Sequence, residues 1–221
     1  MRVELVLPPM GDDLAVVNAA RVSFSKTKTE LDEADKRLIR YLAANNHESP
    51  FAHTALSMTV EAPLFVARQL WKSHVGAASG DVGVFAWNET SRRYVDDEPT
   101  IYAPDQWRGR ADNVKQGSGG ELPPDDAALV SRVYETGAGA ALAAYHSLLR
   151  RGVAPEQARM VLPQSMNTAW RWTGSILFFA RVCRLRLDGH AQQETREIAH
   201  QIGHICRDKF PVSWEALMDR P

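Results

Sequence analysis

The amino-acid sequence predicts an α+β fold, in which helices group around a mixed or antiparallel sheet. Two segments, residues 54–60 and 166–172, alternate apolar and polar side chains as half-buried strands do, and each leads directly into a helical pattern. Long stretches of helical periodicity account for much of the remaining chain. The 221 residues, 44% of them apolar, suffice for one core, so we expect a single domain over residues 1–221.

The first half of the chain is predicted to hold two strands and three helices. Residues 2–7 alternate as a strand, and Asp12 or Asp13 can cap the helix that follows. A second helix is expected over residues 31–44, and the strand at 54–60 leads into a third helix that begins near Pro63. The buried face of the third helix is predicted from the spacing of three apolar residues, Leu64, Ala67 and Trp71.

The second half is predicted to begin with a loop and to be mainly helical. The segment after Tyr94, as far as Gly120, is rich in Gly, Pro and Asp and is expected to hold little regular structure. A long helix over residues 125–151 should end at Gly152, and a short one that begins at Pro155 carries Arg159. After the strand at 166–172, two more helices are expected, one over 175–185 and one that carries Ile198, Ile202 and Ile205.

Composition excludes several classes of function. The formal net charge is −1, which argues against binding of a long nucleic acid, because that requires a strong excess of Lys and Arg. Two cysteines cannot form a disulfide framework. The start of the sequence lacks the apolar core of a signal peptide, and no segment is apolar enough to span a membrane, so we expect a cytoplasmic protein without a membrane partner.

Residues 65–94 combine polar and apolar side chains in a way that is typical of a ligand site. Arg68, Gln69 and Lys72 share one helix face, and a second polar group follows at Asn88, Glu89, Ser91, Arg92 and Arg93. Forked cationic donors suit a phosphate, and amide and carboxylate groups suit the edge of a heterocycle. A charged helix face is often only solvated, but that interpretation explains poorly why this set adjoins Phe65, Leu70, Trp71, Phe85 and Trp87.

The same stretch resembles the signature of the flavin-dependent thymidylate synthases. That signature is an Arg-Gln pair, a triplet of basic residues and His, a spacer, and then Asn-Glu-x-Ser-x-Arg-Tyr; the matching residues are Arg68, Gln69, Asn88, Glu89, Ser91, Arg93 and Tyr94. The triplet, usually Arg-His-Arg or Lys-His-x, is Lys72-Ser73-His74 here, and the spacer is lengthened by a Gly-rich run over residues 76–86. Further fragments that resemble the family, among them QARMVLPQSMNT and RLDGHAQQE, extend the match from about Met10 to Trp214.

The resemblance implies a fold, a reaction and an assembly. The family catalyses reductive methylation of dUMP to dTMP, with methylenetetrahydrofolate as the carbon donor and FAD reduced by NADPH as the hydride source. It is homotetrameric, and each active site is built from several subunits. The alternative is a related nucleotide-binding or pyrimidine-modifying protein, in which the altered triplet and the long spacer have changed or removed the flavin chemistry.

The resemblance also implies which residues form the site. Arg186 takes the place of the catalytic arginine; an arginine cannot act as a base, but beside uracil it would stabilise the deprotonated imide. Substrate binding is expected from Gln69, Lys72, Glu89, Thr90, Ser91, Arg92, Arg93, Arg159 and Arg186. Cofactor binding is expected from Ser23, His47, Ser49, Lys72, Ser73, His74, Val75, Glu89, Ser175, Leu177, Arg181, Leu185 and His190.

Other common catalytic motifs are missing from the sequence. It contains no GxGxxG in a strand-turn-helix context and no GxxxxGK[ST], so a flavin or nucleotide needs another kind of pocket. His200 and His204 stand four residues apart on a helix, but no third ligand is evident, and we assign no metal. Neither Cys183 nor Cys206 lies in a nucleophile motif.

Overall fold

The structure is a computed structural model that describes residues 1–74, 84–95, 97–112 and 117–220. Among the predicted site residues, Val75 lies outside the described residues. The same holds for most of the Gly-rich spacer, including Gly76, Gly80 and Gly83.

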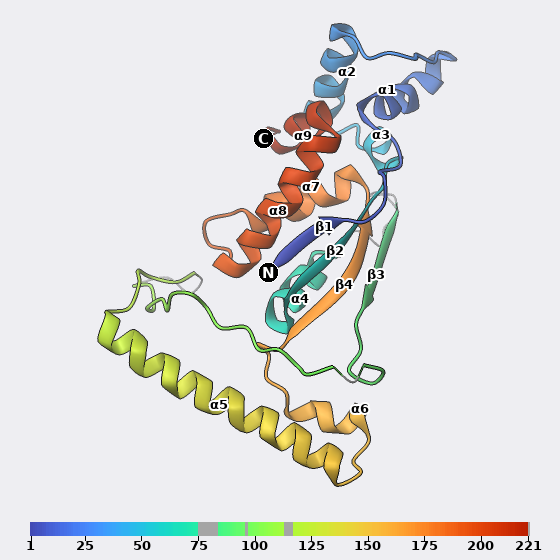
Figure 1. The fold of residues 1–221 in the computed structure, drawn as a ribbon. Coiled ribbons are helices and arrows are strands. Elements are labelled where there is room, and N and C mark those ends of the chain that lie inside the picture. The colour runs from blue at the N-terminus through green and yellow to red at the C-terminus, as the bar shows by residue number, and fades with distance from the viewer. Residues whose placement is uncertain (75–83, 96, 113–116, 221) are drawn as a thin grey trace.

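An antiparallel sheet forms the centre of the described fold (Figure 1). Its strands are β1 (Arg2–Leu5), β2 (Leu56–Pro63), β3 (Phe85–Glu89) and β4 (Asn167–Gly174), and they lie in the order β1-β2-β4-β3. Every neighbouring pair is antiparallel, which decides between the two sheet types that the sequence left open. β3 was not predicted, because its residues were interpreted only as part of the polar site.

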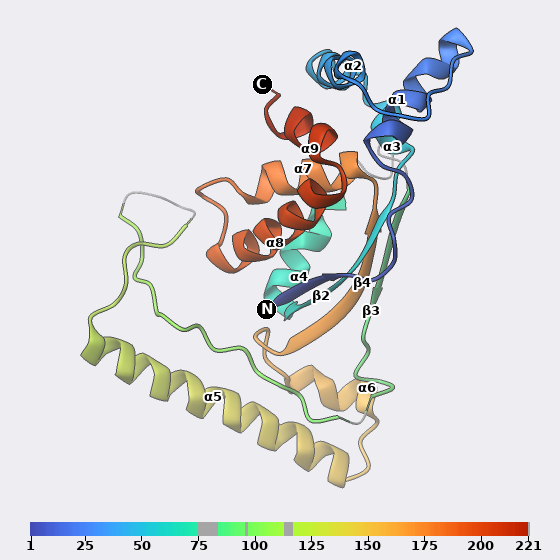
Figure 2. The same ribbon diagram turned by 45° about the horizontal axis from the view of Figure 1, so that its top comes forward.

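One face of the sheet is covered by helices (Figure 2). These are α4 (Leu64–Trp71), α7 (Ile176–Arg186) and α8 (Gln193–Lys209), and α9 (Pro211–Met218) packs against α7 and α8. Leu56, Met58 and Val60 of β2 are fully buried, and the residues between them are half-buried. The register pairs Met58 with Trp172 and Val60 with Trp170, so the two buried indoles point to the same face. The predicted alternation of both strands is therefore confirmed.

The predicted buried face of α4 is wrong. Val66, Ala67 and Leu70 are buried, whereas Trp71 is 50% exposed and Leu64 is half-buried. Both faces have helical spacing, so the pattern alone could not choose between them. α4 follows β2 without an intervening loop, and this junction turns Val66 and Leu70 toward the core. The Trp71 ring instead packs edge to face against Trp87, with 5.4 Å between the ring centroids.

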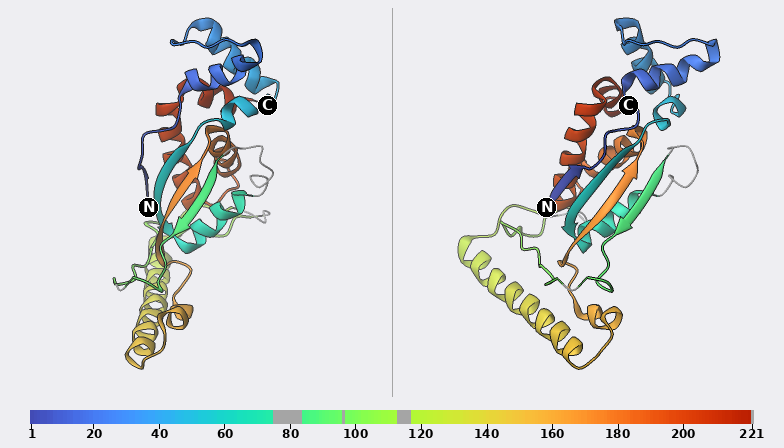
Figure 3. Two further views of the ribbon diagram at one scale, coloured as in Figure 1. Left: turned by 90° about the vertical axis from the view of Figure 1, so that its right-hand side faces the viewer. Right: turned by 45° about the vertical axis from the view of Figure 1, so that its right-hand side comes forward.

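Two groups of helices extend beyond opposite ends of the sheet (Figure 3). α1 (Asp13–Arg21), α2 (Glu33–Ala44) and α3 (Ser49–Ala52) lie at one end, and α5 (Pro124–Arg150) and α6 (Pro155–Ala158) lie at the other. Three short 3₁₀ turns complete the described elements: η1 (Val22–Phe24), η2 (Lys72–His74) and η4 (Arg159–Val161). In α5 only Tyr145 is buried, and Leu129 and Val133 are 54% and 67% exposed. A long helix therefore presents apolar side chains to solvent in the single chain.

Helix termini show how the local sequence fixes these elements. Asp12 caps α1 by accepting a hydrogen bond from the Ala15 amide at 2.9 Å. Asp13, the other candidate, is buried and instead accepts from the amides of Val212 and Ser213 at 2.9 and 2.8 Å, which ties α1 to the start of α9. Gly152, which was predicted to end the long helix, follows α5 and has a φ of +81°, the left-handed conformation that commonly ends a helix.

The segment between Tyr94 and α5 was predicted to be loop. In its described residues the structure shows isolated bridges only, between Ile101 and Met166 and between Arg108 and Glu121. α9 was not predicted. No helix in the described ranges has both the length and the apolar character needed to cross a membrane.

Candidate active site

Arg186, the predicted catalytic residue, lies at the end of α7 and is held by two hydrogen bonds. Its Nη2 donates to the carbonyl oxygen of Gln69 at 2.7 Å, and its Nε donates to Ser73 Oγ at 3.1 Å. Partial burial lowers the pKa of Arg186, but a guanidinium stays protonated over the physiological range. The structure therefore presents a fixed, half-buried cation.

The Gln69 side chain belongs to a network that links α4 to the start of α8. Its Nε2 donates to Gln192 Oε1, and its Oε1 accepts a hydrogen bond from Thr195 Oγ1 at 3.1 Å. Thr195 is fully buried, so the amide of Gln69 is oriented from the core. Gln69, Arg186 and Gln192 line a cavity of about 470 Å³.

His190 lines the same cavity as Arg186. Its Nδ1 lies 2.9 Å from Asp188 Oδ1, and its backbone amide donates to the same oxygen at 2.8 Å. The backbone and then the side-chain hydrogen bond from His190 lower the pKa of Asp188. The structure thus brings together Gln69, Arg186 and His190 from the predicted set, with Ser73 bonded to Arg186.

A second group of predicted residues lines a separate cleft of about 930 Å³. It contains Glu89, Thr90, Arg92 and Arg159. Glu89 accepts a hydrogen bond from Thr168 Oγ1 at 3.0 Å. A neighbouring cavity of about 500 Å³ is lined by Lys72 and Glu89 together with the rings of two tryptophans, Trp71 and Trp87. Glu89 therefore lies where these two spaces meet.

Ser91 and Arg93 lie on the turn that follows β3. Arg93 Nε donates to Ser91 Oγ at 3.1 Å, and the Arg93 guanidinium lies 4.8 Å from the centroid of the Tyr94 ring. Arg93 and Tyr94 are exposed. Neither Ser91 nor Arg93 lines the cavities described above, so the single chain does not join them to Arg186.

The remaining predicted cofactor residues are distributed over the fold. Ser23 lies in η1, His47 lies just before α3 and Ser49 is the first residue of α3, at the end of the molecule that α1 and α2 form. Ser175 and Leu177 are fully buried, and Ser175 Oγ caps α7 by accepting from the Phe178 amide at 3.0 Å. Arg181 and Leu185 of α7 are exposed. None of these remaining cofactor residues lines a cavity described above.

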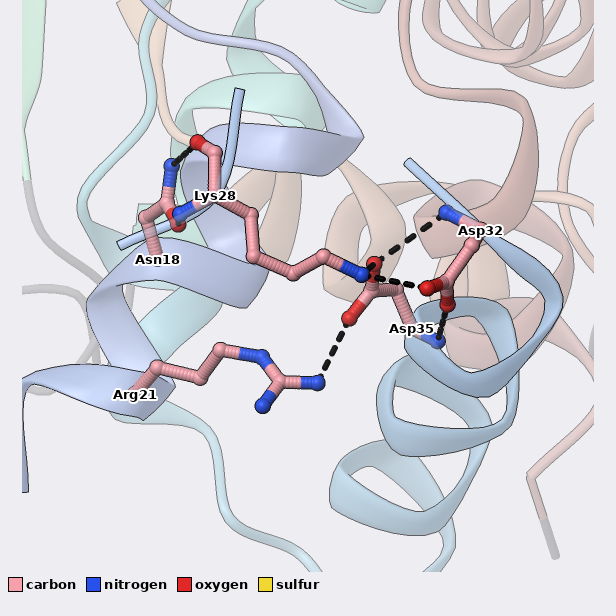
Figure 4. Close-up of polar contacts among 5 residues, drawn as sticks. All are labelled: Asn18, Arg21, Lys28, Asp32 and Asp35. Carbon is pink, nitrogen blue, oxygen red and sulfur yellow. Dashed lines mark hydrogen bonds and ion pairs between the residues drawn. The ribbon is translucent and has the colours of Figure 1, made fainter. Parts of the chain in front are cut away.

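The segment that carries Ser23 is held by a cluster of ionic contacts (Figure 4). Asp35 of α2 is fully buried and accepts from Arg21 at 2.7 Å and from Lys28 at 2.6 Å. Burial alone would raise the pKa of Asp35, but the hydrogen bonds from Lys28 and Arg21 outweigh it and hold that pKa well below its usual range. Asn18 pairs with the backbone of Lys28 through both an N–H and a C=O. Both ends of the segment between α1 and α2 are thereby fixed.

The thiols and the histidine pair were predicted to have no catalytic role. Cys183 and Cys206 are fully buried, and burial raises the pKa of both thiols. His200 and His204 are exposed on α8, and no group of three metal-ligating side chains occurs within the described ranges. Three contacts near the site were not predicted: those of Gln192 and Thr195 with Gln69, and the ion pair between Arg108 and Glu194 at 2.6 Å. Nothing in the local sequence pairs residues so far apart.

Comparison with known proteins identifies the family. The family model described as thymidylate synthase complementing protein, Thy1, matches residues 5–212. Flavin-dependent thymidylate synthases from Thermosipho africanus and Thermus thermophilus are 37% and 39% identical to this chain, over 95% and 94% of its length and 87% and 72% of theirs.

Solved structures agree with this assignment. The UMP/dUMP methylase PolB from Streptomyces cacaoi, bound with 5-Br dUMP, has a TM-score of 0.83 at 31% identity, and the match covers 99% of this chain and 95% of that one. The same methylase bound with 5-Br UMP has a TM-score of 0.82 at 30% identity, over 97% of this chain and 92% of that one. Both the predicted family and its fold are confirmed, and the chain belongs to the flavin-dependent thymidylate synthases.

Proposed function

We propose that the protein methylates dUMP reductively to dTMP, with methylenetetrahydrofolate as the carbon donor and NADPH-reduced FAD as the hydride source. The observation that carries this proposal is the fixed position of Arg186 beside Gln69 in one cavity. Family membership supplies the reaction class, and these residues supply the groups that such a reaction needs. We place the enzyme in the cytoplasm.

Arg186 has a clear electrostatic role in this reaction. Carbon 5 of uracil becomes nucleophilic when negative charge on the pyrimidine is stabilised, and a protonated guanidinium beside the imide does this without a proton transfer of its own. Because its Nη2 and Nε are bound to Gln69 and Ser73, the side chain does not need to reorganise when charge develops. The Gln69 amide, oriented by Thr195, is suited to hold the edge of the base.

The described residues offer poor support for a covalent protein nucleophile. Ser91 Oγ accepts from Arg93 Nε, and a cation beside a hydroxyl cannot remove its proton. The two thiols are buried and have raised pKa values, so a thiolate is disfavoured at both positions. Charge stabilisation by Arg186 is therefore the mechanism that these side chains fit best.

The donor set around Arg186 fits a flavin. When bound, reduced FAD would supply the hydride. Ser73 and His190 offer hydrogen-bond donors of the kind that bind a diphosphate and ring carbonyl groups, and Ser73 Oγ lies 3.1 Å from Arg186 Nε. Lys72, which precedes Ser73 in η2 and lines the 500 Å³ cavity, adds a cation. Spectroscopy of the purified protein tests this assignment: flavin absorbance that bleaches with NADPH supports it. A colourless protein that cannot be reconstituted with FAD would instead favour a relative without flavin chemistry.

We propose that the active unit is a homotetramer. Two observations support shared sites: the predicted ligand residues occupy several separate surfaces of one chain, and α5 exposes Leu129 and Val133. An assembly in which a second chain covers α5 and adds residues to these cavities would account for both observations. Light scattering coupled to size exclusion measures the mass directly, and a monomer that makes dTMP would contradict this proposal.

A second candidate substrate is UMP. It has a specific basis, because the structural neighbour PolB is described as a UMP/dUMP methylase and has been seen with 5-Br UMP as well as 5-Br dUMP. The two nucleotides differ in one 2′-hydroxyl group. Parallel assays with equal concentrations of dUMP and UMP distinguish these substrates: we expect dUMP to be methylated preferentially, and a preference for UMP would reverse the assignment.

A further inference from the structure

A cavity of about 490 Å³ is lined by none of the predicted site residues. Its lining residues come from α4, α5, the start of α8 and the connections that precede α5 and β4, and its volume suits a small molecule. Arg108, Ser118 and Gln192 line both this cavity and the one that holds Gln69 and Arg186. The two cavities are therefore neighbours with a shared wall.

Aromatic side chains give this cavity flat apolar walls, and we call it the aromatic cavity; they are Phe65, Tyr102, Trp107 and Tyr134. Phe65 and Tyr102 pack edge to face, with 6.0 Å between the ring centroids, and the Trp107 and Tyr134 rings do so at 5.3 Å. The Trp107 indole N–H donates to Ser131 Oγ at 2.8 Å. The Tyr134 hydroxyl donates to the Tyr102 carbonyl oxygen. These contacts hold the rings in place, so the cavity is preformed for another planar ring.

Glu194 adds a buried negative charge to the lining of the aromatic cavity. Only 5% of its side chain is exposed, and its Oε1 accepts a hydrogen bond from Arg108 Nη2 at 2.6 Å. Burial alone would raise the pKa of Glu194, but the contacts led by the hydrogen bond from Arg108 outweigh burial and lower that pKa, so the carboxylate is ionised at neutral pH. Burial, and then the charge of Glu194, raise the pKa of Tyr102 to about 12.

The second carboxylate oxygen of Glu194 lacks a donor. Its Oε2 is buried and has no hydrogen-bond partner in the part of the chain that the structure describes. Arg108 gives its Nη2 to the other oxygen, and its Nε donates to Ser118 Oγ at 2.9 Å. A buried anionic oxygen without a donor is costly, and an N–H group from a ligand would recover that cost.

We propose that the aromatic cavity binds a planar nitrogen heterocycle with an exocyclic NH₂ group, with the ring against the aromatic walls and the NH₂ group donating to Glu194. Both ring systems of NADPH have this chemistry, because nicotinamide carries a carboxamide and adenine carries an amino group. The inference rests on the proposed function and deepens it, since it names the residues that recognise the hydride source. The wall shared with the catalytic cavity places a dinucleotide bound here next to the flavin proposed beside Arg186.

The first test compares NADPH with two analogues, each of which lacks one NH₂ group. In one analogue acetylpyridine replaces nicotinamide, and in the other hypoxanthine replaces adenine. The readout, on wild-type protein loaded with FAD, is the concentration of each donor that half-saturates bleaching of the flavin. We expect one analogue, and not the other, to require a concentration about 10-fold higher than NADPH does, because one charge-assisted hydrogen bond is lost. The affected analogue identifies the ring that binds.

The second test removes the charge of Glu194. Glu194→Gln should raise the half-saturating concentration of NADPH about 10-fold and reduce discrimination against the affected analogue to about twofold, because a neutral amide is a weaker acceptor than a carboxylate. The affinity for dUMP should stay within about twofold of the wild type. Glu215→Gln is the matched control: Glu215 also pairs with an arginine, Arg40, but that pair is exposed and lines none of the cavities described. It should match the wild type.

Equal half-saturating concentrations of NADPH and both analogues in the wild type would overturn the inference, and this comparison does not depend on a variant that folds. The same conclusion would follow if Glu194→Gln responded to NADPH as Glu215→Gln does, or if it lost dUMP and NADPH affinity equally, since the ion pair would then only support the shared wall. In each of these cases NADPH still bleaches the wild-type flavin, and the proposed function stands. A wild-type flavin that NADPH does not bleach would refute the proposed hydride source and the inference with it, so the two failures are distinguishable.

Discussion

Asp35 keeps a charge at a fully buried position because two cations reach it from the chain segment that holds Ser23. Arg21 lies at the end of α1, and Lys28 lies in the connection to α2, so one carboxylate fixes both ends of this connection. Removing the carboxylate would leave Arg21 and Lys28 without their common partner. The contact therefore matters for stability and for the order of the segment next to η1.

Asp35→Asn should lower the free energy of unfolding by about 2–3 kcal/mol, because the loss of one member of a buried ion pair is costly and the two cations are only partly solvated. Glu33→Gln is the matched control: its ion pair with Lys36 is exposed and should contribute little to stability. Urea denaturation of both variants gives the comparison. A loss for Asp35→Asn no larger than for Glu33→Gln would show that the cluster does not stabilise the fold.

The pH dependence of the wild type follows from the same group. The pKa of Asp35 is lower in the folded protein than in the unfolded chain. The ionised carboxylate therefore contributes fully to the free energy of unfolding above its unfolded pKa, about 3.9, and this contribution is lost as pH falls toward the folded pKa. Asp35→Asn should therefore lose less stability on acidification below about pH 5 than the wild type does. Parallel slopes of stability against pH for the two proteins would contradict this assignment.

At the residue scale, the family resemblance named candidate ligand residues but not the residues that hold them in place. Gln69, Glu89, Arg159 and Arg186 were predicted from the resemblance, and each lines a cavity. Thr195, which orients Gln69, is 126 residues away along the chain, and a single sequence contains no signal for that pairing. The division of the set between separate cavities was also not predictable from local pattern.

At the scale of elements, the junction between β4 and α7 depends on the absence of a side chain at Gly174. A Cβ atom there would lie 2.3 Å from Phe178 Cδ1, and Phe178 is 1% exposed in the core. Gly174→Ala should therefore destabilise the protein by about 1–3 kcal/mol through overpacking. Gly139→Ala on α5 is the control, because no atom lies within 4 Å of its added Cβ, and it should stabilise by about 0.5–1 kcal/mol. Thermal and urea denaturation measure both, and equal effects would contradict the packing argument.

Periodicity predicted most of the helices and the two central strands because their residues repeat at clear intervals over six or more positions. Prediction from periodicity failed where an element is short or where either of two helix faces could be the buried one. β3 has five residues and follows the Gly-rich spacer, so no alternation extends far enough to be seen. On α4, two apolar faces have the same spacing, and only the packing against the sheet selects Val66 and Leu70.

At the scale of the whole molecule, α5 links the fold to the proposed tetramer. Val133 is 67% exposed in the single chain, and a second subunit that packs there would bury it. Val133→Glu should dissociate the assembly while the far-ultraviolet circular dichroism is retained. Ala128→Glu places the same charge on an exposed position of a different face of α5 and should leave the mass unchanged. Light scattering reports the outcome; a Val133→Glu variant that remains tetrameric would exclude this face from the interface.

The central claim is that Arg186 activates the pyrimidine by stabilising its negative charge. Arg186→Lys tests it most directly, because lysine keeps the positive charge but cannot reproduce the two hydrogen bonds to Gln69 and Ser73 or the fork toward a planar imide. The measurement is the turnover of dUMP to dTMP with methylenetetrahydrofolate, NADPH and FAD, in variant and wild type of equal FAD content and equal melting temperature. We predict that turnover falls by about 10²- to 10³-fold, the usual cost of losing a preorganised electrostatic contact. Turnover within about twofold of the wild type would contradict the role of Arg186, since a contact of that kind costs far more than this when it is lost.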